Sequence, residues 1–408
     1  MSDWRGTSAR RPSSSRAGTI RKRNRRAWPA RVSSPISRPA ICPGRSNGSW
    51  RRRTCLSWND VRRLLIVKPS SLGDIVHTLP TLAAFRRRFP RATLSWLVKR
   101  EWAEVLEGQP DLDDVLAVDL SVQGWPAAIR AVREGRFDLV VDLQGLLRSA
   151  VLGWASGSPA RVGFANGREG SPWFYTHRVP VPDASMHAVD RYLLMARFLG
   201  AAPEKPGPSA FCLPRDPAAD ARVEALLAAA GVRVGTMLVA LNPSARWATK
   251  QWPVASFAAV GDWLQRHGGA RVAVVGGRAE RSAGDEVIRL MQTAPLDLVG
   301  QTTMKELIAL LRRLRVLITN DSGPMHLAAA VGTPVIALFG PTDPGRTGPY
   351  GAGHVVLHSG VPCSPCFSRR CANAVTLECL TSIRSQQVIE AATTLLKGEE
   401  RCQSTRTC

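Results

Sequence analysis

The stretch that decides the fold is Leu64-Leu65-Ile66-Val67, followed directly by the loop Lys68-Pro69-Ser70-Ser71-Leu72-Gly73-Asp74. Four consecutive apolar residues predict a strand that is buried on both faces, as in parallel sheets. The loop leads into an amphipathic segment from Ile75 to Phe89, which Pro90 closes. Strand, loop and helix in this order are the repeating unit of open α/β sheets, so we expect the first folded domain to start here.

The same unit recurs along the chain in two series. Strands of the first series are expected at Thr93 to Val98, Val115 to Val118 and Asp138 to Leu143. Strands of the second series are expected at Met237 to Leu241, Arg271 to Val275, Val316 to Thr319 and Pro334 to Phe339. The helices between the latter are expected near Val254 to His267, Arg281 to Met291, Met304 to Arg313 and Met325 to Val331. This alternation predicts an α/β fold of parallel sheets with right-handed crossovers.

A proline-dense stretch from Pro203 to Pro217 separates the two series. We therefore expect an N-terminal Rossmann-like domain over residues 61–229 and a C-terminal one over residues 230–384. A last helix over residues 385–398 is expected to pack back across both halves, and residues 399–408 to form a tail. The length of 408 residues fits two domains, because a single hydrophobic core rarely grows beyond about 250–300 residues.

Positive charge is concentrated at the N-terminus. The formal net charge is +23, and residues 1–60 hold 15 Lys and Arg against only Asp3 and Asp60. We interpret this Arg-, Ser-, Pro- and Gly-rich segment as a disordered basic extension. A basic arm for nucleic acid or an anionic membrane, and a natural start of the polypeptide near Val61, are the alternatives. The moderate excess in the rest of the chain favours anionic small substrates, so we expect no nucleic-acid partner.

Composition favours a soluble, globular, cytoplasmic protein. Hydrophobic residues make up 44% and charged residues 21% of the chain. No apolar run reaches the roughly 18 to 20 residues that cross a bilayer, and no secretory hydrophobic segment precedes the first domain. Nine cysteines in a chain of this length do not form a disulfide framework.

Asp74 lies just beyond the carboxyl end of the first strand, where open parallel sheets place their ligands. Gly73 lets a backbone approach closely, and the carboxylate of Asp74 is able to take a proton from an attacking hydroxyl. A purely structural helix-capping role explains Asp74 equally well, so both interpretations stay open. His77 follows one turn later, and packing on the helix face is at least as good an explanation as substrate contact.

Two loops of the second series are candidate anion sites. The loop from Asn242 to Pro253 contains Ser244 and Lys250, which could hold a diphosphate, although a surface lysine is more often simply solvated. The turn Asp321-Ser322-Gly323-Pro324-Met325-His326 joins a strand to a helix start, where free backbone amides bind phosphate. A capping turn with a core histidine is the alternative. The loop from Phe339 to Pro344 is expected near the same pocket.

Four cysteines, Cys363, Cys366, Cys371 and Cys379, have the spacing C-x2-C-x4-C-x7-C. This spacing is compatible with a structural zinc or iron–sulfur site. Because no partner motif accompanies them, loop thiols, with redox activity as one option, are the favoured interpretation. No metal is assigned.

Five motifs of the chain resemble those of the ADP-heptose:lipopolysaccharide heptosyltransferases of glycosyltransferase family 9, in particular heptosyltransferase I. The motifs are IVKPSSLGDIVHTLP at 66–80, VDLQGLLRSA at 141–150, GRE at 167–169, DSGPMH at 321–326 and GPTDPGRTGPYG at 340–351. The resemblance covers about residues 61–395. It implies the GT-B fold, in which two Rossmann-like parallel-sheet domains face each other across a cleft.

The resemblance also implies substrates and a location. The C-terminal half would bind ADP-L-glycero-D-manno-heptose, and the N-terminal half would bind the lipid A–Kdo inner core of lipopolysaccharide at the inner-membrane surface. The protein would be cytoplasmic, with a peripheral place on the inner face of the inner membrane. No cofactor is implied besides the donor, and the sequence shows no DxD-type metal pair, so the resemblance implies a metal-independent mechanism.

Carried over by matching positions, the resemblance makes Asp74 the general base that deprotonates the acceptor hydroxyl, with inversion as ADP leaves. The acceptor-binding residues would be Lys68, His77, Arg148 and Arg168, because guanidinium groups bind carboxylates and phosphates in a bidentate way. The donor-binding residues would be Ser244, Lys250, Glu280, Thr302, Asp321, Ser322, Gly323 and His326.

Three features depart from the heptosyltransferase I pattern. The loop before Lys250 is longer, and neither the cysteine segment nor the basic extension has a counterpart. The alternatives are heptosyltransferase II or III, a family 9 enzyme for another glycan, a GT-B sugar-nucleotide epimerase, and a basic nucleic-acid-binding protein with a degenerate Rossmann core.

Overall fold

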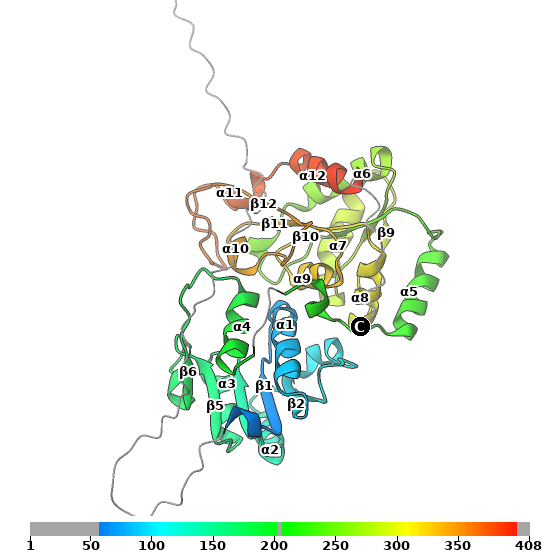
Figure 1. The fold of residues 1–408 in the computed structure, drawn as a ribbon. Coiled ribbons are helices and arrows are strands. Elements are labelled where there is room, and N and C mark those ends of the chain that lie inside the picture. The colour runs from blue at the N-terminus through cyan, green and yellow to red at the C-terminus, as the bar shows by residue number, and fades with distance from the viewer. Residues whose placement is uncertain (1–56, 202–205, 398–408) are drawn as a thin grey trace, which may run out of the picture.

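The computed structural model of the chain describes residues 57–201 and 206–397. These residues form two α/β halves, one above the other in Figure 1. The predicted basic extension over residues 1–60 lies outside the described residues except for its last four, and the predicted tail 399–408 lies wholly outside them. Within the described ranges, no helix combines the length and apolar character needed to cross a membrane.

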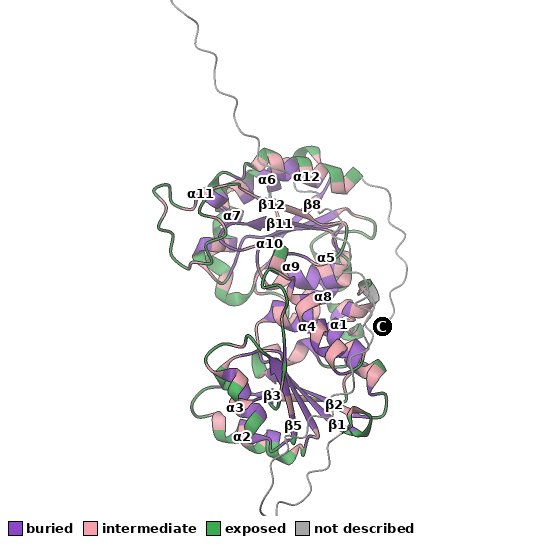
Figure 2. Cartoon of the chain, turned by 60° about the vertical axis from the view of Figure 1, so that its left-hand side comes forward, coloured by how far each residue is buried: buried purple, intermediate pink, exposed green. Residues whose placement is uncertain are grey.

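A six-stranded, wholly parallel sheet forms the centre of the N-terminal half, with the order β3-β2-β1-β4-β5-β6. The strands are β1 (Arg63–Val67), β2 (Thr93–Lys99), β3 (Asp114–Val118), β4 (Leu139–Asp142), β5 (Ala160–Phe164) and β6 (His177–Val179). The order reverses between β1 and β4, and such switch points are where open sheets bind ligands. The two central strands are almost completely buried, as the purple strands of Figure 2 show.

The C-terminal half repeats this design with the order β12-β11-β10-β7-β8-β9, again all parallel. Its strands are β7 (Leu238–Asn242), β8 (Arg271–Val274), β9 (Leu296–Asp297), β10 (Val316–Asn320), β11 (Val335–Phe339) and β12 (Val355–His358). Read from the other edge, the order matches that of the first sheet, with the switch point between β7 and β10. The predicted α/β fold of two Rossmann-like halves is confirmed.

Helices cover the faces of both sheets. The N-terminal half contributes α1 (Leu72–Arg88), α2 (Trp125–Glu134), α3 (Leu147–Ala155) and α4 (Ala188–Phe198). The rest of the chain contributes α5 (Pro217–Ala229), α6 (Val254–His267), α7 (Arg281–Leu290), α8 (Met304–Arg313), α9 (Gly323–Val331), α10 (Pro344–Thr347), α11 (Glu378–Thr381) and α12 (Ser385–Lys397). Short 3-10 helices are η1 (Trp58–Asp60), η2 (Arg100–Val105), η3 (Ser171–Phe174), η4 (Pro208–Phe211), η5 (Ala248–Lys250) and η6 (Arg278–Glu280).

Helices α5 and α12, at the ends of the two predicted domains, both pack on the C-terminal half. Helix α5 packs on α8 of the C-terminal half, where Glu224 pairs with Arg313 at 2.5 Å. Helix α12 packs on α6, β10 and β11, and its buried residues Val388, Ile389 and Ala392 belong to the core of the C-terminal half. It lies at the far end of that half in Figure 1, so it covers the C-terminal sheet instead of bridging both halves as expected.

The two halves meet through the N-terminal ends of α1 and α9. A Cβ on Gly73 would overlap the imidazole of His326, and a Cβ on Gly323 would lie 2.6 Å from Cδ2 of Leu72. Both glycines are therefore required by this close approach, since no side chain fits between the helices. The contact brings the predicted Asp74 loop directly against the predicted Asp321-to-His326 turn.

Most element bounds agree with the sequence predictions to within one residue or two. Helices α6 and α8 occupy the predicted ranges, whereas α1 and α9 begin two to three residues earlier than predicted, at Leu72 and Gly323. The earlier starts follow from the caps, because Ser71 and Ser322 take extended conformations directly before each helix. Strands β5, β6, β9 and β12 were not predicted. Polar or glycine residues interrupt β5, whereas β6 and β9 have only three and two residues, and the apolar run of β12 is limited to Val355-Val356-Leu357.

Candidate functional site

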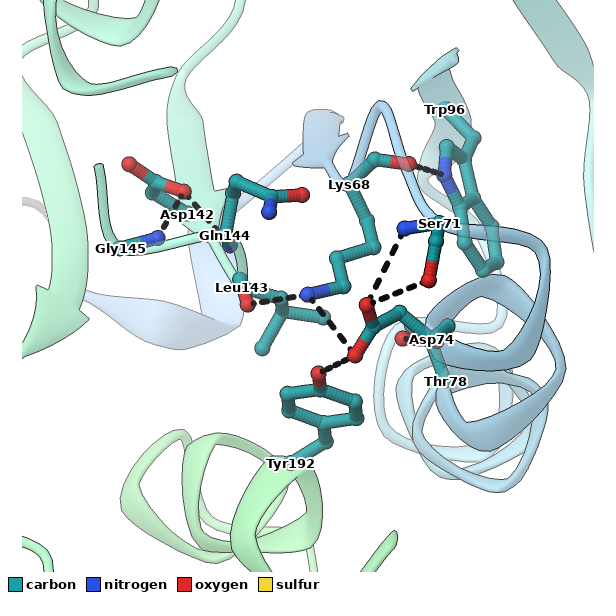
Figure 3. A network of polar contacts seen from close by, with 10 residues as sticks. All are labelled: Lys68, Ser71, Asp74, Thr78, Trp96, Asp142, Leu143, Gln144, Gly145 and Tyr192. Atoms are coloured by element: carbon teal, nitrogen blue, oxygen red, sulfur yellow. Dashed lines mark hydrogen bonds and ion pairs between the residues drawn. The ribbon is translucent and has the colours of Figure 1, made fainter. Parts of the chain in front are cut away.

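Asp74 lies in the first turn of α1, at the carboxyl end of β1 (Figure 3). The backbone amide and the hydroxyl of Ser71 both donate to Asp74 Oδ2, at 3.1 and 3.0 Å. The capping role that the sequence left open is therefore present. The capping hydrogen bonds use only Oδ2 of Asp74, so capping does not explain the contacts made by its other carboxylate oxygen, Oδ1.

The second oxygen, Oδ1, faces residues from other parts of the N-terminal half. The hydroxyl of Tyr192, on α4, donates to it at 2.6 Å, and Lys68 Nζ lies 3.6 Å away. Lys68 is buried, donates to the backbone oxygen of Leu143 at 3.1 Å, and lies 4.7 Å from the centre of the Tyr192 ring. The side chain of Asp74 is still 34% exposed, so a bound hydroxyl has access to it.

Electrostatics keep Asp74 ionised. Burial raises the pKa of Asp74, but Lys68, the Tyr192 hydroxyl and Ser71 together hold this pKa below its ordinary value. Burial lowers the pKa of Lys68, an effect that the nearby carboxylates of Asp74 and Asp142 oppose. Burial and the adjacent Asp74 raise the pKa of Tyr192 well above its ordinary value, so its hydroxyl stays a donor. An ionised, partly exposed carboxylate in this position is chemically able to act as a general base.

Asp142, at the end of β4, organises the loop that follows it. It accepts hydrogen bonds from the backbone amides of Gln144 and Gly145 at 2.8 and 3.1 Å, and from Ser149 and Tyr175 at 2.7 Å each. Burial raises the pKa of Asp142 despite these donors. Neither Asp142 nor Tyr192 was predicted as a site residue. Asp142 belongs to a recognisable motif, whereas nothing in the local sequence distinguishes Tyr192.

The predicted acceptor arginines flank this loop. Arg148 is the second residue of α3, and the backbone amide of Arg168 donates to the oxygen of Gly145 at 2.9 Å. Both arginine side chains are exposed. Together with Lys68, they border the carboxyl end of the β1–β4 switch point, which agrees with a site for an anionic group.

His77, predicted to bind the acceptor, lies in a buried group of three histidines at the contact between the halves. Its ring centroid is 4.4 Å from that of His326 on α9 and 5.1 Å from that of His187, which caps α4. Burial, followed by the neighbouring His326, His187 and Lys68, lowers the pKa of His77 well below its ordinary value. The structure thus provides the packing environment that the sequence offered as the alternative for His77.

The turn before α9 holds the predicted donor residues Lys250 and Asp321 together. Lys250 Nζ donates to Asp321 Oδ2 at 2.6 Å, and Thr342 Oγ1 donates to the same oxygen at 2.7 Å. Asp321 is buried and Lys250 is mostly so. Burial lowers the pKa of His326, an effect that the carboxylates of Asp321 and Asp74 oppose. Thr342 comes from the loop that was expected near this pocket.

Ser322 lies in this turn directly before α9, and Ser244 follows Pro243, whose backbone oxygen accepts a hydrogen bond from Asn320 at 2.7 Å. Asn242, at the end of β7, donates to Ser322 Oγ and to Thr319 Oγ1 at 2.9 Å each. Ser244 is buried, and its hydroxyl has no hydrogen-bond partner among the described residues. A buried hydroxyl without a partner is costly, and a bound ligand is one way to satisfy it. Asn242 begins the loop that the sequence identified as a candidate anion site, but Asn242 itself was not predicted as a site residue.

Glu280 and Thr302 lie on neighbouring loops at the carboxyl ends of β8 and β9. The amide of Gly300 donates to the oxygen of Gly276 at 2.8 Å, which holds the two loops side by side. Glu280 Oε2 accepts from the amide of Gly277 at 2.8 Å. Thr302 is half-buried directly before the cap of α8. Both residues lie on the β8–β9 side of the sheet, next to the switch point between β7 and β10.

The four cysteines Cys363, Cys366, Cys371 and Cys379 line one cavity of about 290 Å³ beside η5. All four are free thiols, and Cys379 is buried. Burial, with the other three thiols, raises the pKa of Cys379. Over residues 57–201 and 206–397, no group of three or more His, Cys, Asp and Glu side chains is arranged to hold a metal ion.

Known proteins share both the sequence pattern and this architecture. Residues 125–376 match the model of glycosyltransferase family 9 (heptosyltransferase). Lipopolysaccharide heptosyltransferase 1 of Pseudomonas aeruginosa is 32% identical over 83% of this chain and 99% of its own length.

Two solved structures are also similar. A family 9 glycosyltransferase from Veillonella parvula has a TM-score of 0.73 at 26% identity, covering 84% of this chain and 98% of its own. The Escherichia coli heptosyltransferase WaaC with ADP has a TM-score of 0.63 at 23% identity, covering 82% and 99%, which supports the GT-B fold. Because the family model spans more than half of the chain, and a relative above 30% identity spans most of it, the protein belongs to glycosyltransferase family 9, the heptosyltransferases.

Proposed function

We propose that the protein transfers heptose from ADP-L-glycero-D-manno-heptose to the Kdo inner core of lipopolysaccharide, with inversion and without a metal ion. The observation that carries this proposal is the position of Asp74. It is an ionised, partly exposed carboxylate at the N-terminus of α1, and this helix end packs against the start of α9, directly after the turn in which Asp321 pairs with Lys250. A base and a diphosphate-binding turn must face each other for a single displacement.

In the proposed reaction, a Kdo hydroxyl attacks the anomeric carbon of the donor heptose. Asp74 takes the hydroxyl proton while the new carbon–oxygen bond forms. The bond from the anomeric carbon to the diphosphate oxygen breaks, and ADP leaves with the electron pair. Attack from the face opposite to the leaving group inverts the configuration.

The donor side is proposed to stabilise the leaving ADP with positive charge and hydrogen bonds. Lys250 would exchange Asp321 for the diphosphate, and the amides at the start of α9, next to Gly323, would bind the same group. The unpaired hydroxyl of Ser244 would donate to it. Ser322 and His326 would border the site, and Glu280 and Thr302 would contact the adenosine.

On the acceptor side, Arg148 and Arg168 are proposed to bind the carboxylates of Kdo, and Lys68 to keep Asp74 ionised. The role of His77 would be to support the contact between the halves next to the acceptor. The protein would work in the cytoplasm at the inner face of the inner membrane, where a lipid A–Kdo acceptor is exposed.

The test measures ADP release by the full-length protein with ADP-heptose and Kdo2-lipid A. Asp74→Ala should lower the rate by about 100-fold or more, the range expected for loss of a general base. Asp216→Ala is the matched control, because Asp216 also caps a helix, accepting from the amides of Ala218 and Ala219, but lies outside the site. Unchanged release by a folded Asp74→Ala protein would refute the assignment of the base.

Further conditions separate the alternatives. Release that requires an already heptosylated acceptor would indicate a type II or III enzyme, and conversion of the sugar nucleotide without any acceptor would indicate an epimerase. Loss of activity in EDTA would contradict metal independence. If deleting residues 1–60 abolished both nucleic-acid binding and biological activity while Asp74→Ala had no effect, the nucleic-acid alternative would replace the proposal.

A further inference from the structure

An aromatic patch is exposed on the N-terminal half, on helix α3 and the neighbouring 3-10 helix η3. Trp173 is 83% exposed, Trp154 is 57% exposed, and Leu147 at the start of α3 is 41% exposed. The rings of Trp154 and Phe174 lie 6.5 Å apart, so α3 and η3 present one continuous surface. We call Leu147, Trp154, Trp173 and Phe174 the tryptophan patch.

Exposed tryptophans are unusual in this protein. Among the described residues, no other tryptophan is exposed, and Trp96 and Trp252 are completely buried in the two halves. Clustered, exposed apolar side chains on a soluble domain usually mark an interaction surface. A tryptophan has an apolar body with one polar N–H group, and this combination favours the boundary between lipid headgroups and acyl chains.

The segment that carries the tryptophan patch is basic. Residues 147–178 contain four arginines, Arg148, Arg161, Arg168 and Arg178, and only one acidic residue, Glu169. Arg178 adjoins η3, because its Nε donates to the backbone oxygen of Pro172 at 2.9 Å. Arginines around exposed aromatic residues complement a surface that is anionic outside and apolar inside, as a bilayer with anionic lipids is.

The tryptophan patch also adjoins the proposed acceptor site. Helix α3 carries Arg148 in its first turn and Trp154 in its last, and the loop that carries Arg168 leads directly into η3. We propose that the tryptophan patch docks the enzyme on an anionic lipid bilayer, with both indoles at the headgroup boundary. This inference rests on the proposed function, in which the acceptor sugar is attached to a lipid and must be presented at a membrane.

Leu147 and Arg148, at the start of α3, lie at the carboxyl end of β4, which is the same end of the sheet as Asp74, whereas Trp154, in the last turn of α3, lies towards the other end of the sheet. The rest of α3 supports the surface rigidly, since Leu152 and Ala155 are buried in the N-terminal half. The tryptophans are thus presented by a packed helix and an adjoining short turn instead of by a long loop.

The test measures co-sedimentation of the full-length protein with vesicles of phosphatidylglycerol and phosphatidylcholine, and with vesicles of phosphatidylcholine alone. Wild type should bind the anionic vesicles more strongly. The double variant Trp154→Ser/Trp173→Ser should lower the partition coefficient about tenfold, because interfacial binding scales with buried apolar area. The double variant Val122→Ser/Val234→Ser is the matched control, since both valines are about 90% exposed but lie outside the tryptophan patch.

Residues 1–60 are strongly basic by sequence, so the measurement is repeated at about 0.5 M salt, which screens charge attraction but not indole burial. Wild type should keep a salt-resistant fraction on the vesicles that the tryptophan variant loses. Equal partitioning of wild type and tryptophan variant at both salt concentrations would overturn the proposal. The proposal would also be overturned if wild type did not bind vesicles but self-associated, and only the tryptophan variant abolished this self-association.

A water-soluble, delipidated Kdo acceptor separates this inference from the proposed function. The tryptophan variant should release ADP with it at the wild-type rate within twofold, yet be about tenfold slower with acceptor embedded in vesicles. No release by wild type with either acceptor would contradict the proposed function, whereas the vesicle result would still decide the docking surface. Unchanged melting temperatures establish that the variants are folded.

Discussion

Replacing Tyr192 by phenylalanine removes a single oxygen atom and with it the 2.6 Å hydrogen bond to Asp74 Oδ1. The ring remains in place, so Lys68 keeps its position 4.7 Å from the ring centre. Ser71 still donates to the other oxygen. The variant therefore changes the charge balance of the proposed base with little change in packing.

The direction of the effect follows from the pKa of Asp74, which Lys68, Tyr192 and Ser71 hold below its ordinary value against the opposing effect of burial. Without the Tyr192 donor this pKa rises, and Asp74 takes up its proton at higher pH. A hydrogen bond to a charged group contributes about 1.5–3 kcal/mol, and about 1.4 kcal/mol corresponds to a factor of ten. Because Asp74 is 34% exposed, water replaces part of the lost bond, so the lower end of this range applies.

The assay is the pH profile of kcat/KM for ADP release, which reports ionisations of the free enzyme. We expect the acidic limb of Tyr192→Phe to lie about one pH unit above that of wild type, with a small change at neutral pH, where Asp74 stays ionised. Tyr175→Phe is the control, because the buried Tyr175 donates to Asp142 at 2.7 Å instead of to Asp74. An acidic limb that stays in place in Tyr192→Phe, or moves equally in Tyr175→Phe, would refute the reasoning.

Three further predictions follow from the other contacts. Lys250→Ala should lower kcat/KM for the ADP-sugar by about 100-fold, as expected for the loss of one charge-stabilising donor, and Lys250→Arg should retain part of the activity. Equal steady-state rates of wild type and Lys250→Ala would contradict the proposed donor role. Gly73→Ala should lower the free energy of unfolding by about 1–3 kcal/mol in urea titration, because its Cβ overlaps His326, whereas Gly360→Ala, in open space, should have little effect. Burial holds the pKa of His77 below its ordinary value, so the contribution of neutral His77 to stability is complete above about pH 6.5 and is lost as pH falls towards the folded-state pKa. The melting temperature should therefore fall below pH 6.5, and it should fall less steeply in His77→Gln. Identical slopes of melting temperature against pH in the two proteins would exclude His77 as the cause.

Local sequence was sufficient for the elements of the fold that carry the candidate site residues. The run Leu64 to Val67 and the loop to Asp74 show a buried strand, a turn and a capped helix in consecutive residues, and each signal is local. The turn from Asp321 to His326 repeats this logic in the second half. By contrast, β5 and β9 have no such signal, because Arg161 and Gly163 interrupt the apolar residues of β5 and the edge strand β9 has only two residues.

The sequence offered candidate site residues only where a motif surrounded them, and even within a motif it did not single out Asp142. Asp74 and Lys250 were predicted as site residues, whereas Tyr192, which lies 118 positions from Asp74, was missed. A tyrosine on an amphipathic helix normally packs in the core, and only the approach of α4 to α1 turns its hydroxyl towards Asp74. The sequence also did not indicate that Lys250 pairs with Asp321, which lies 71 positions away.

The sequence by itself determined the alternation of strands and helices, the two halves and the loops at the carboxyl ends of the strands, because burial patterns and caps are properties of neighbouring residues. Only the tertiary structure decided that Gly73 meets His326, that the three histidines share one buried space, and that Trp154 and Trp173 are exposed together. The physical reason is that such contacts depend on how packed helices approach one another. That approach is set by the whole core and leaves no mark on any short stretch of sequence.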